Sequence, residues 1–161
     1  MDAIVATDRS WAIGYRGDLL FRLSHDLKRF KELTIGHPVI LGRKTLETFP
    51  GKKPLPGRPH FILSRDPAFQ VENARVFHNE ETLLAQAPPD SFLIGGESVY
   101  RLLLPHCRRV FLTKVDAVFP ADAHFPNLDE IPQWKLVHAS SVMEEDGFPF
   151  RYLTYENKEF L

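Results

Sequence analysis

Short apolar runs alternate with helix-like segments along the first two thirds of the chain. The runs are short enough to be buried strands, and they cover residues 4–6, 38–41, 61–63, 75–77 and 92–94. Helices are predicted at residues 26–33 with Ser24 as the N-cap, at 43–48, at 80–87, and after Gly96. The last of these has Val99, Leu102 and Leu103 at helical spacing.

The pattern changes towards the C-terminus, where single residues alternate in character. Residues 109–115 alternate as a strand does, and residues 134–143 and 148–155 flank Asp146-Gly147, a hairpin turn signal. Strands that alternate with helices and then close in a hairpin predict an α/β fold. We expect one domain over residues 1–161, with a central, mostly parallel twisted sheet, an antiparallel C-terminal edge strand and flanking helices.

Residues 7–23 lack a clear period and contain Gly14 and Gly17, so they are predicted to form a long mobile loop. A loop of that length inside a compact domain is usually functional.

Composition narrows the class of protein. The chain has 161 residues, is 43% hydrophobic and carries a formal net charge of -1, which argues against a general nucleic-acid binder. Cys107 is the single cysteine, so an internal disulfide is excluded and a small buried hydrophobe is the simplest interpretation. The N-terminus has no secretion signal and no apolar run reaches membrane-span length, so we expect a cytoplasmic protein. The seven histidines show no metal-ligand spacing, and no metal is predicted.

Chemistry-bearing residues follow three of the predicted strands. Gly42-Arg43-Lys44-Thr45, Ser64-Arg65 and Gly95-Gly96-Glu97-Ser98 come directly after them. Ligands of open α/β sheets bind beyond the carboxyl ends of the strands, and cations there favour a 2′-phosphate. The bare Gly-Gly backbone before a helix start also suits a phosphate. The segments after these three strands therefore predict NADPH rather than NADH. The alternative interpretation is that each cation is a solvated surface charge and that the glycines only allow the turn.

Asp26 is the acid that stands out. It lies early in the first predicted helix, and Phe30 follows at i+4 on the same face. One interpretation is an acid that complements the helix dipole. The other is a carboxylate at the wall of an apolar pocket, where it could hold a flat amidine-like ring edge through two hydrogen bonds and take part in proton chemistry.

Taken in order, these segments resemble the dihydrofolate reductase family. The matching residues are 4–6, 12–14, Asp26-Leu27 with Phe30-Lys31, 38–45, 54–58, 62–65, Ile94-Gly95-Gly96 with Val99-Tyr100, and Asp122 with 124–126. The resemblance implies an oxidoreductase that reduces 7,8-dihydrofolate to 5,6,7,8-tetrahydrofolate, with hydride from NADPH and protonation at N5, in support of one-carbon metabolism. It also implies a cis bond between Gly95 and Gly96.

The resemblance assigns roles to residues of this chain. Asp26 is implied as the catalytic residue, with Thr113 in its hydrogen-bond network, and Arg58 as the partner of the substrate's α-carboxylate. The implied substrate-binding residues are Ile4, Ala6, Asp26, Leu27, Phe30, Phe49, Leu55, Arg58, Ile94, Tyr100 and Thr113. The implied cofactor-binding residues are Ala6, Ile13, Gly14, Gly42, Arg43, Lys44, Thr45, Leu63, Ser64, Arg65, Ile94, Gly95, Gly96, Glu97, Ser98, Val99 and Tyr100.

The sequence departs from the family pattern at Leu20-Phe21, where bacterial members commonly have Pro-Trp. Phe21 has no donor for the ordered water that the Trp indole usually helps to hold, and Trp11 offers an indole in the same segment. His60 stands where an Asn is common.

Two other functions fit parts of the chain. A pyrimidine reductase of riboflavin synthesis shares the features of the Gly-Gly turn, and a non-catalytic nucleotide-binding protein would keep the strand-end cations. Dihydrofolate reduction is favoured over both by Asp26 on its apolar helix and by Arg58 after Pro56-Gly57. The expected partners are then dihydrofolate and antifolate inhibitors, for a monomer that binds neither nucleic acid nor membrane.

Overall fold

A nine-stranded sheet forms the centre of the protein. The computed structural model describes residues 1–160, and the main path of the sheet runs in the order β10-β12-β8-β1-β7-β4-β5-β6, with β11 paired to β12. The strands are β1 (Asp2–Thr7), β4 (Val39–Gly42), β5 (His60–Leu63), β6 (Arg75–Phe77), β7 (Phe92–Gly95), β8 (Arg109–Val115), β10 (Trp134–Ala139), β11 (Met143–Glu145) and β12 (Phe148–Asn157).

The direction of the strands divides this sheet into two parts. The strands from β8 through β1, β7, β4 and β5 to β6 are parallel neighbours. β12 is antiparallel to β8, β10 and β11. The predicted mostly parallel sheet with an antiparallel C-terminal edge is therefore confirmed. The segment predicted as one strand over residues 134–143 is divided into β10 and β11, and both pair with β12.

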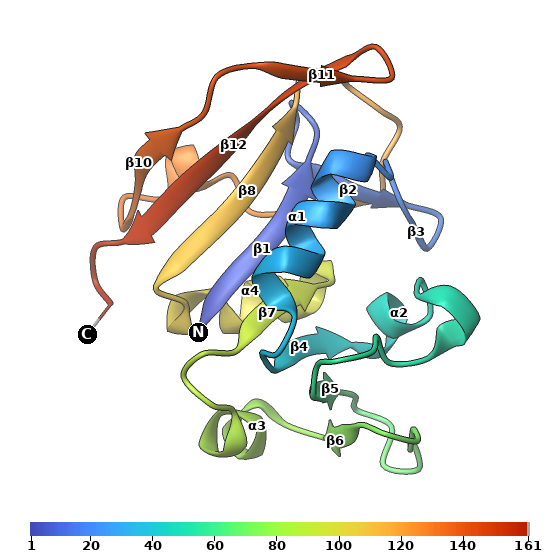
Figure 1. Cartoon of the computed structure of the whole chain (residues 1–161). Helices are drawn as coiled ribbons and strands as arrows, with labels where there is room; N and C mark the ends of the chain where they lie inside the picture. The colour runs from blue at the N-terminus through green and yellow to red at the C-terminus, as the bar shows by residue number, and fades with distance from the viewer. Residues whose placement is uncertain (161) are drawn as a thin grey trace.

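Helices cover both faces of the sheet. They are α1 (Ser24–Thr34), α2 (Arg43–Leu46), α3 (Glu80–Gln86) and α4 (Glu97–Leu103), with short 3-10 turns η1 (Pro50–Lys52), η2 (Leu104–His106) and η3 (Leu128–Glu130). In Figure 1, α1 lies in front of the sheet and α4 behind it. The alternation along β1 explains this, because Ala3 and Val5 pack in one apolar cluster with Tyr100 of α4, whereas Ile4 packs in another with Phe30 of α1.

The segment 7–23, predicted as a loop without regular structure, contains two strands. β2 (Ala12–Tyr15) pairs with β3 (Asp18–Leu19) and with β9 (Ala123–His124) in a second, three-stranded sheet. The partner strand β9 lies more than 100 positions away, so local sequence carries no sign of the pairing. His124 is one of the two residues of β9.

The start of α1 also differs from the prediction. Leu23, not Ser24, is the N-cap residue, and its side chain makes no cap hydrogen bond. The carboxylate of Glu145 instead accepts the N–H groups of Ser24 at 2.6 Å and His25 at 2.9 Å. A side chain from β11 thus satisfies helix-end donors that a local cap would otherwise hold.

Cys107 is fully buried, and its thiol donates to the carbonyl of Leu103 at 3.6 Å. Burial raises the pKa of this thiol to about 12. The interpretation as a small buried hydrophobe is consistent with both observations. Among residues 1–160, none of the helices is long and apolar enough to cross a membrane.

Candidate active site

Three strand ends converge at one edge of the parallel sheet. In the register of the sheet, Gly42 at the end of β4 pairs with Leu63 of β5, and Leu41 pairs with Gly95 of β7. The segments after these strands therefore lie beside one another, as the sequence predicted. The peptide bond between Gly95 and Gly96 is cis, as the family resemblance implied.

The backbone at this edge is too crowded for larger residues. A Cβ atom on Gly42 would lie 2.9 Å from Cγ2 of Val99, and one on Gly95 would lie 3.2 Å from Oγ1 of Thr45. Gly95 also has a φ of 126°, in the region that favours glycine. A bare main chain that α2 and α4 approach closely is a fitting cradle for the phosphates and the ring of a dinucleotide.

Arg43, one of the cations at this edge, has acidic and aromatic neighbours. Arg43 is exposed, and its guanidinium lies 3.3 Å from the carboxylate of Glu47, 3.5 Å from that of Asp66, and over the ring of Phe69 at 4.5 Å. The sequence analysis identified the cations at this edge, and the structure adds the acids Glu47 and Asp66 beside Arg43. Lys44 and Arg65 are exposed at the same edge, where Arg65 directly follows the buried Ser64.

Tyr100 of α4 connects the segment after β7 to the first strand, β1. Its side chain is 3% exposed, and its hydroxyl donates to the carbonyl of Ile4 at 2.7 Å. Burial raises the pKa of this phenol well above its ordinary range, so it remains neutral. Glu97, at the start of α4, accepts the N–H of His124 at 2.9 Å, which links the Gly-Gly turn to the small sheet that contains Ile13 and Gly14.

Asp26 has one side-chain partner in the site. Oγ1 of Thr113, on β8, donates to Oδ1 of Asp26 at 2.5 Å. Burial raises the pKa of the Asp26 carboxyl, while the Thr113 hydrogen bond and the charge of Arg29 oppose that rise. A carboxyl held in this way can accept hydrogen bonds from ring N–H groups and can take part in proton transfer. The predicted network of Asp26 and Thr113 is thus formed.

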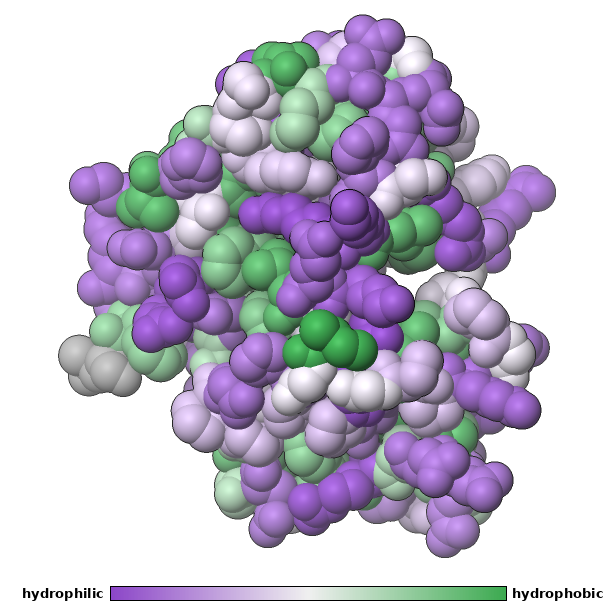
Figure 2. All heavy atoms as spheres, viewed as in Figure 1, coloured by the Kyte–Doolittle hydropathy of each residue, from purple (hydrophilic) through white to green (hydrophobic). Residues whose placement is uncertain are grey.

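An apolar wall lies beside this acid. Ile4 and Ile94 are buried in one cluster, against which Phe30 of α1 and Phe49 pack. Leu27, one turn before Phe30, remains 45% exposed. Figure 2 shows the surface indented between the part that carries α1 and β3 and the part that carries α2. Four of the predicted substrate-side residues, Ile4, Phe30, Phe49 and Ile94, therefore pack together in one cluster.

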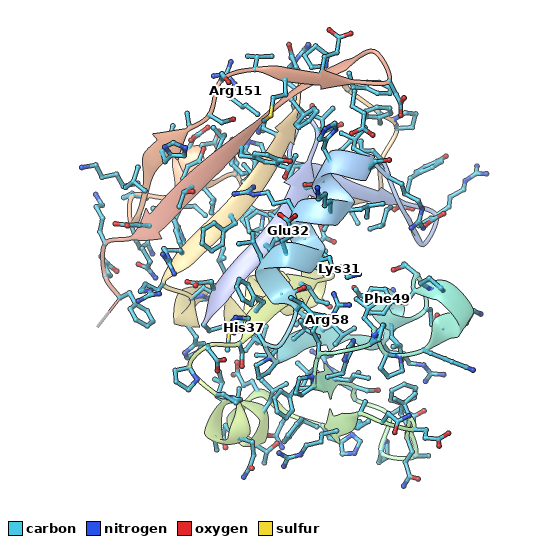
Figure 3. The ribbon with its side chains drawn as sticks, in the orientation of Figure 1. Lys31, Glu32, His37, Phe49, Arg58 and Arg151 are labelled. Carbon is cyan, nitrogen blue, oxygen red and sulfur yellow. The ribbon has the colours of Figure 1, made fainter. Side chains whose placement is uncertain are left out.

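Arg58 closes the far end of this wall. Nη1 donates to Oγ1 of Thr34 at 3.2 Å, and Nε donates to the carbonyl of Pro56 at 3.0 Å. In Figure 3, Arg58 lies beside the C-terminal half of α1. The fork is thus held by its own loop and by the last turn of the helix that carries Asp26, with donors left for a carboxylate.

His60 has a structural part in this loop that the sequence did not indicate. Its Nε2 accepts the N–H of Leu55 at 3.0 Å, so its Nδ1 carries the proton that is donated to the carbonyl of Arg58 at 2.8 Å. Burial lowers the pKa of this imidazole, which favours the neutral form that can accept at Nε2. The only available signal was a histidine two positions after Arg58.

Phe21 and Trp11 lie in different surroundings. The ring of Phe21 packs edge-on against Phe119 at 5.4 Å. The ring of Trp11 lies under the ammonium of Lys114 at 3.6 Å. Because neighbouring residues of a strand point to opposite faces, Lys114 and Thr113 are on opposite sides of β8. The Trp11 ring is therefore on the face away from Asp26 and does not replace the missing indole.

Comparisons with known proteins agree with this geometry. A family profile described as dihydrofolate reductase matches residues 1–157. The chain is 35% identical to the dihydrofolate reductase of Bacillus subtilis, with 96% of this chain and 93% of the relative covered, and 37% identical to that of Mycobacterium leprae, with 94% of each covered. A solved structure of the Enterococcus faecalis dihydrofolate reductase, complexed with NADP(H) and RAB-propyl, superposes with a TM-score of 0.88. It is 33% identical and covers 98% of this chain and 96% of its own.

Proposed function

Since the chain belongs to the dihydrofolate reductase family and reduces 7,8-dihydrofolate to tetrahydrofolate with NADPH, we propose which residues carry out each part of the reaction. The proposal rests on one observation above all, the hydrogen bond between Thr113 and the partly buried carboxyl of Asp26 beside an apolar wall. With the family match over residues 1–157, the pyrimidine-reductase and non-catalytic alternatives lose their support.

Asp26 is the catalytic residue of this proposal. Its anionic carboxylate accepts two hydrogen bonds from the 2-amino group and the ring N–H of the pterin, which fixes the ring in the cleft. The same contact favours protonation at N5, because a carboxylate raises the basicity of the ring to which it is bound. Thr113 orients the carboxylate through Oδ1, which leaves Oδ2 and the second lone pair of Oδ1 for the substrate.

The rest of the substrate extends along α1. Leu27, Phe30, Phe49 and Leu55 enclose the pterin and benzoyl groups, and Ile4 and Ile94 form the floor. Arg58 binds the α-carboxylate through its planar fork, since Thr34 and the carbonyl of Pro56 already fix its orientation.

The cofactor side is formed by the strand ends. Bound NADPH supplies the hydride that reduces C6 of the pterin. Gly42, Gly95 and Gly96 let α2 and α4 pack directly against this edge, because added Cβ atoms would meet Val99 and Thr45, and the main chain at the start of α4 then faces the dinucleotide. Arg43, Lys44, Thr45, Ser64 and Arg65 hold the phosphates.

The remaining cofactor contacts come from the elements that border the nicotinamide end. They are Ala6, Ile13, Gly14, Leu63, Ile94, Glu97, Ser98, Val99 and Tyr100. Tyr100 is anchored to the carbonyl of Ile4, so it keeps the turn at Gly95 close to the first strand. These residues would hold the nicotinamide end of NADPH beside the pterin, so the protein contributes orientation rather than chemistry.

We also propose that the chain acts as a single-domain monomer in the cytoplasm, that it does not bind nucleic acid, and that antifolates compete for the pterin cleft. The defining experiment follows NADPH consumption by the purified protein with dihydrofolate as the only acceptor. Turnover with dihydrofolate and none with a ribosylated aminopyrimidine supports the proposal. Binding of both ligands without turnover contradicts it.

A further inference from the structure

Arg29 is a half-buried cation that has no assigned part in the reaction. Its Nη1 is buried and has no hydrogen-bond partner among residues 1–160. Its guanidinium stacks over the ring of Tyr152 at 3.9 Å and lies 6.0 Å from that of Phe111. A buried, incompletely bonded guanidinium is costly, so its retention at this place calls for a compensating interaction.

The sheet register places this guanidinium beside the catalytic acid. Tyr152 on β12 lies directly opposite Thr113 on β8, and directly opposed residues of a sheet point to the same face. Thr113 holds Asp26 from that face, and Phe111 shares it two positions earlier. Arg29 also follows Asp26 by three positions on α1, a spacing that makes helix neighbours. Two independent routes, through the sheet and along the helix, therefore bring Arg29 to Asp26.

We propose that Arg29 is a positioning residue that acts through Asp26, as the half-buried positive charge that keeps this carboxylate in its ionised, substrate-binding form. The inference rests on the role proposed above for Asp26. An arginine suits this task because its guanidinium stays protonated even when it is partly desolvated. Tyr152 supports the charge through its ring face while leaving the guanidinium edge free.

Among the other titratable groups near Arg29 and Asp26, Glu145 raises the pKa of Asp26 and Tyr152 is neutral. Burial is the main cause that raises the pKa of Asp26, and Glu145 on β11 adds to it, whereas Arg29 lowers that pKa. Tyr152 remains neutral, since burial raises the pKa of its phenol. Arg29 is thus the cation that offsets burial of the acid, and Thr113 contributes a hydrogen bond without charge.

The test is a titration of Asp26 that does not depend on turnover. In protein with 13C-labelled aspartate, the Asp26 carboxyl signal is assigned with D26N and followed against pH. R29M keeps an apolar stem and removes the charge, R29Q restores an N–H donor without charge, and R29K restores the charge. The midpoint of Asp26 should rise by about one pH unit in R29M and R29Q and stay closer to wild type in R29K.

Lys28 provides the matched control. It is on the same helix, is exposed and pairs with Glu32 at 4.0 Å, so K28M removes an equal charge from the solvent side. K28M should leave the midpoint unchanged. As pH falls, Asp26 becomes protonated and the KM for dihydrofolate should rise. In R29M this rise should begin at a correspondingly higher pH than in wild type, with a smaller change in kcat. An unshifted midpoint in R29M and R29Q, or an equal shift in K28M, would overturn the proposal. By contrast, full turnover of D26N would overturn the role of Asp26 itself and leave the titration result intact.

Discussion

Glu145 and His25 are 120 positions apart in the chain, yet one carboxylate oxygen of Glu145 holds both the backbone and the ring of His25. Oε1 accepts the His25 N–H at 2.9 Å and lies 2.7 Å from its Nδ1, while Oε2 accepts the N–H of Ser24. The end of β11 thereby fixes the first turn of α1, which carries Asp26. Hydrogen bonds to the C-terminal hairpin therefore hold the helix turn that carries the proposed catalytic acid.

Replacement of Glu145 by Gln should destabilise the protein at neutral pH. The amide keeps one acceptor and loses the charge that suits a helix N-terminus. Hydrogen bonds to His25 and Ser24 lower the pKa of Glu145 below its ordinary 4.5. The stabilisation is therefore complete above that value and is lost as pH falls through the lowered folded pKa. Thermal melting should show a lower Tm for E145Q that converges with wild type in acid. E144Q, at an exposed neighbour, is the control, and an equal loss there would refute the capping role.

Asp26→Asn should separate activity from stability. Turnover near neutral pH should fall by about 100-fold or more, since the amide cannot serve as an anion or in proton supply. The Tm should rise instead. Because burial raises the folded pKa of Asp26 above its ordinary 3.8, ionisation costs native stability as pH increases through that interval, and the amide escapes this cost.

The two measurements are steady-state NADPH consumption and thermal melting against pH. D90N, in an exposed carboxylate that pairs with His37, should retain turnover. Wild-type turnover in D26N at neutral pH would remove Asp26 from the mechanism.

Arg58→Lys should weaken substrate binding with little change in kcat. A lysine cannot reproduce the planar fork that Thr34 and the Pro56 carbonyl orient, so KM for dihydrofolate should rise about tenfold or more. Dihydropteroate lacks the glutamyl group and is the matched substrate. Its KM should be the same for wild type and R58K, and a parallel rise for both substrates would place the α-carboxylate elsewhere.

The His60 imidazole should make the substrate loop sensitive to acid. Burial lowers the folded pKa of His60 below its ordinary 6.5, so the stability it contributes is full above that value and is lost as pH falls through the folded pKa. Protonation removes the acceptor for the Leu55 N–H and loosens the loop that carries Arg58.

His60→Asn should abolish most of this dependence, because an amide supplies both a donor and an acceptor without titrating. The Tm and the KM for dihydrofolate would be measured from about pH 8 to about pH 5, where histidines titrate. H106N, in an exposed histidine, should behave like wild type. An unchanged acid response in H60N would assign the effect to another group.

Replacing Arg43 and Arg65 by Leu should reduce the preference for NADPH over NADH. Loss of each charge-assisted contact to the 2′-phosphate should lower the ratio of the two kcat/KM values by about tenfold. The effect of Arg43 should be the smaller one, because Glu47 and Asp66 already neutralise part of its charge. K135L, at an exposed position of β10, is the control, and an unaltered ratio in both arginine variants would place the phosphate elsewhere.

Local patterns predicted the strands of the parallel sheet well, because most of them are short apolar runs, and β4 and β7 are buried at every position. The predicted strand ends identified the segments that carry the candidate cofactor residues. The parallel register brings these strand ends to one edge of the sheet. The predictions were wrong where a distant partner decides the structure. β2 and β3 depend on β9, and the start of α1 depends on Glu145. Asp66, which faces Arg43, was missed for the same reason.

The sequence by itself determined the fold class, the family and the candidate residues, because apolar periodicity, glycine positions and ordered motifs are properties of the linear chain. Only the tertiary structure decided how those residues are tuned. The Thr113 bond to Asp26 and the stack of Arg29 on Tyr152 join separate elements, and the two bonds of His60 form only when its loop folds back on the ring. Burial and the distance between charges set the ionisation of these groups, and both quantities exist only once the chain has folded.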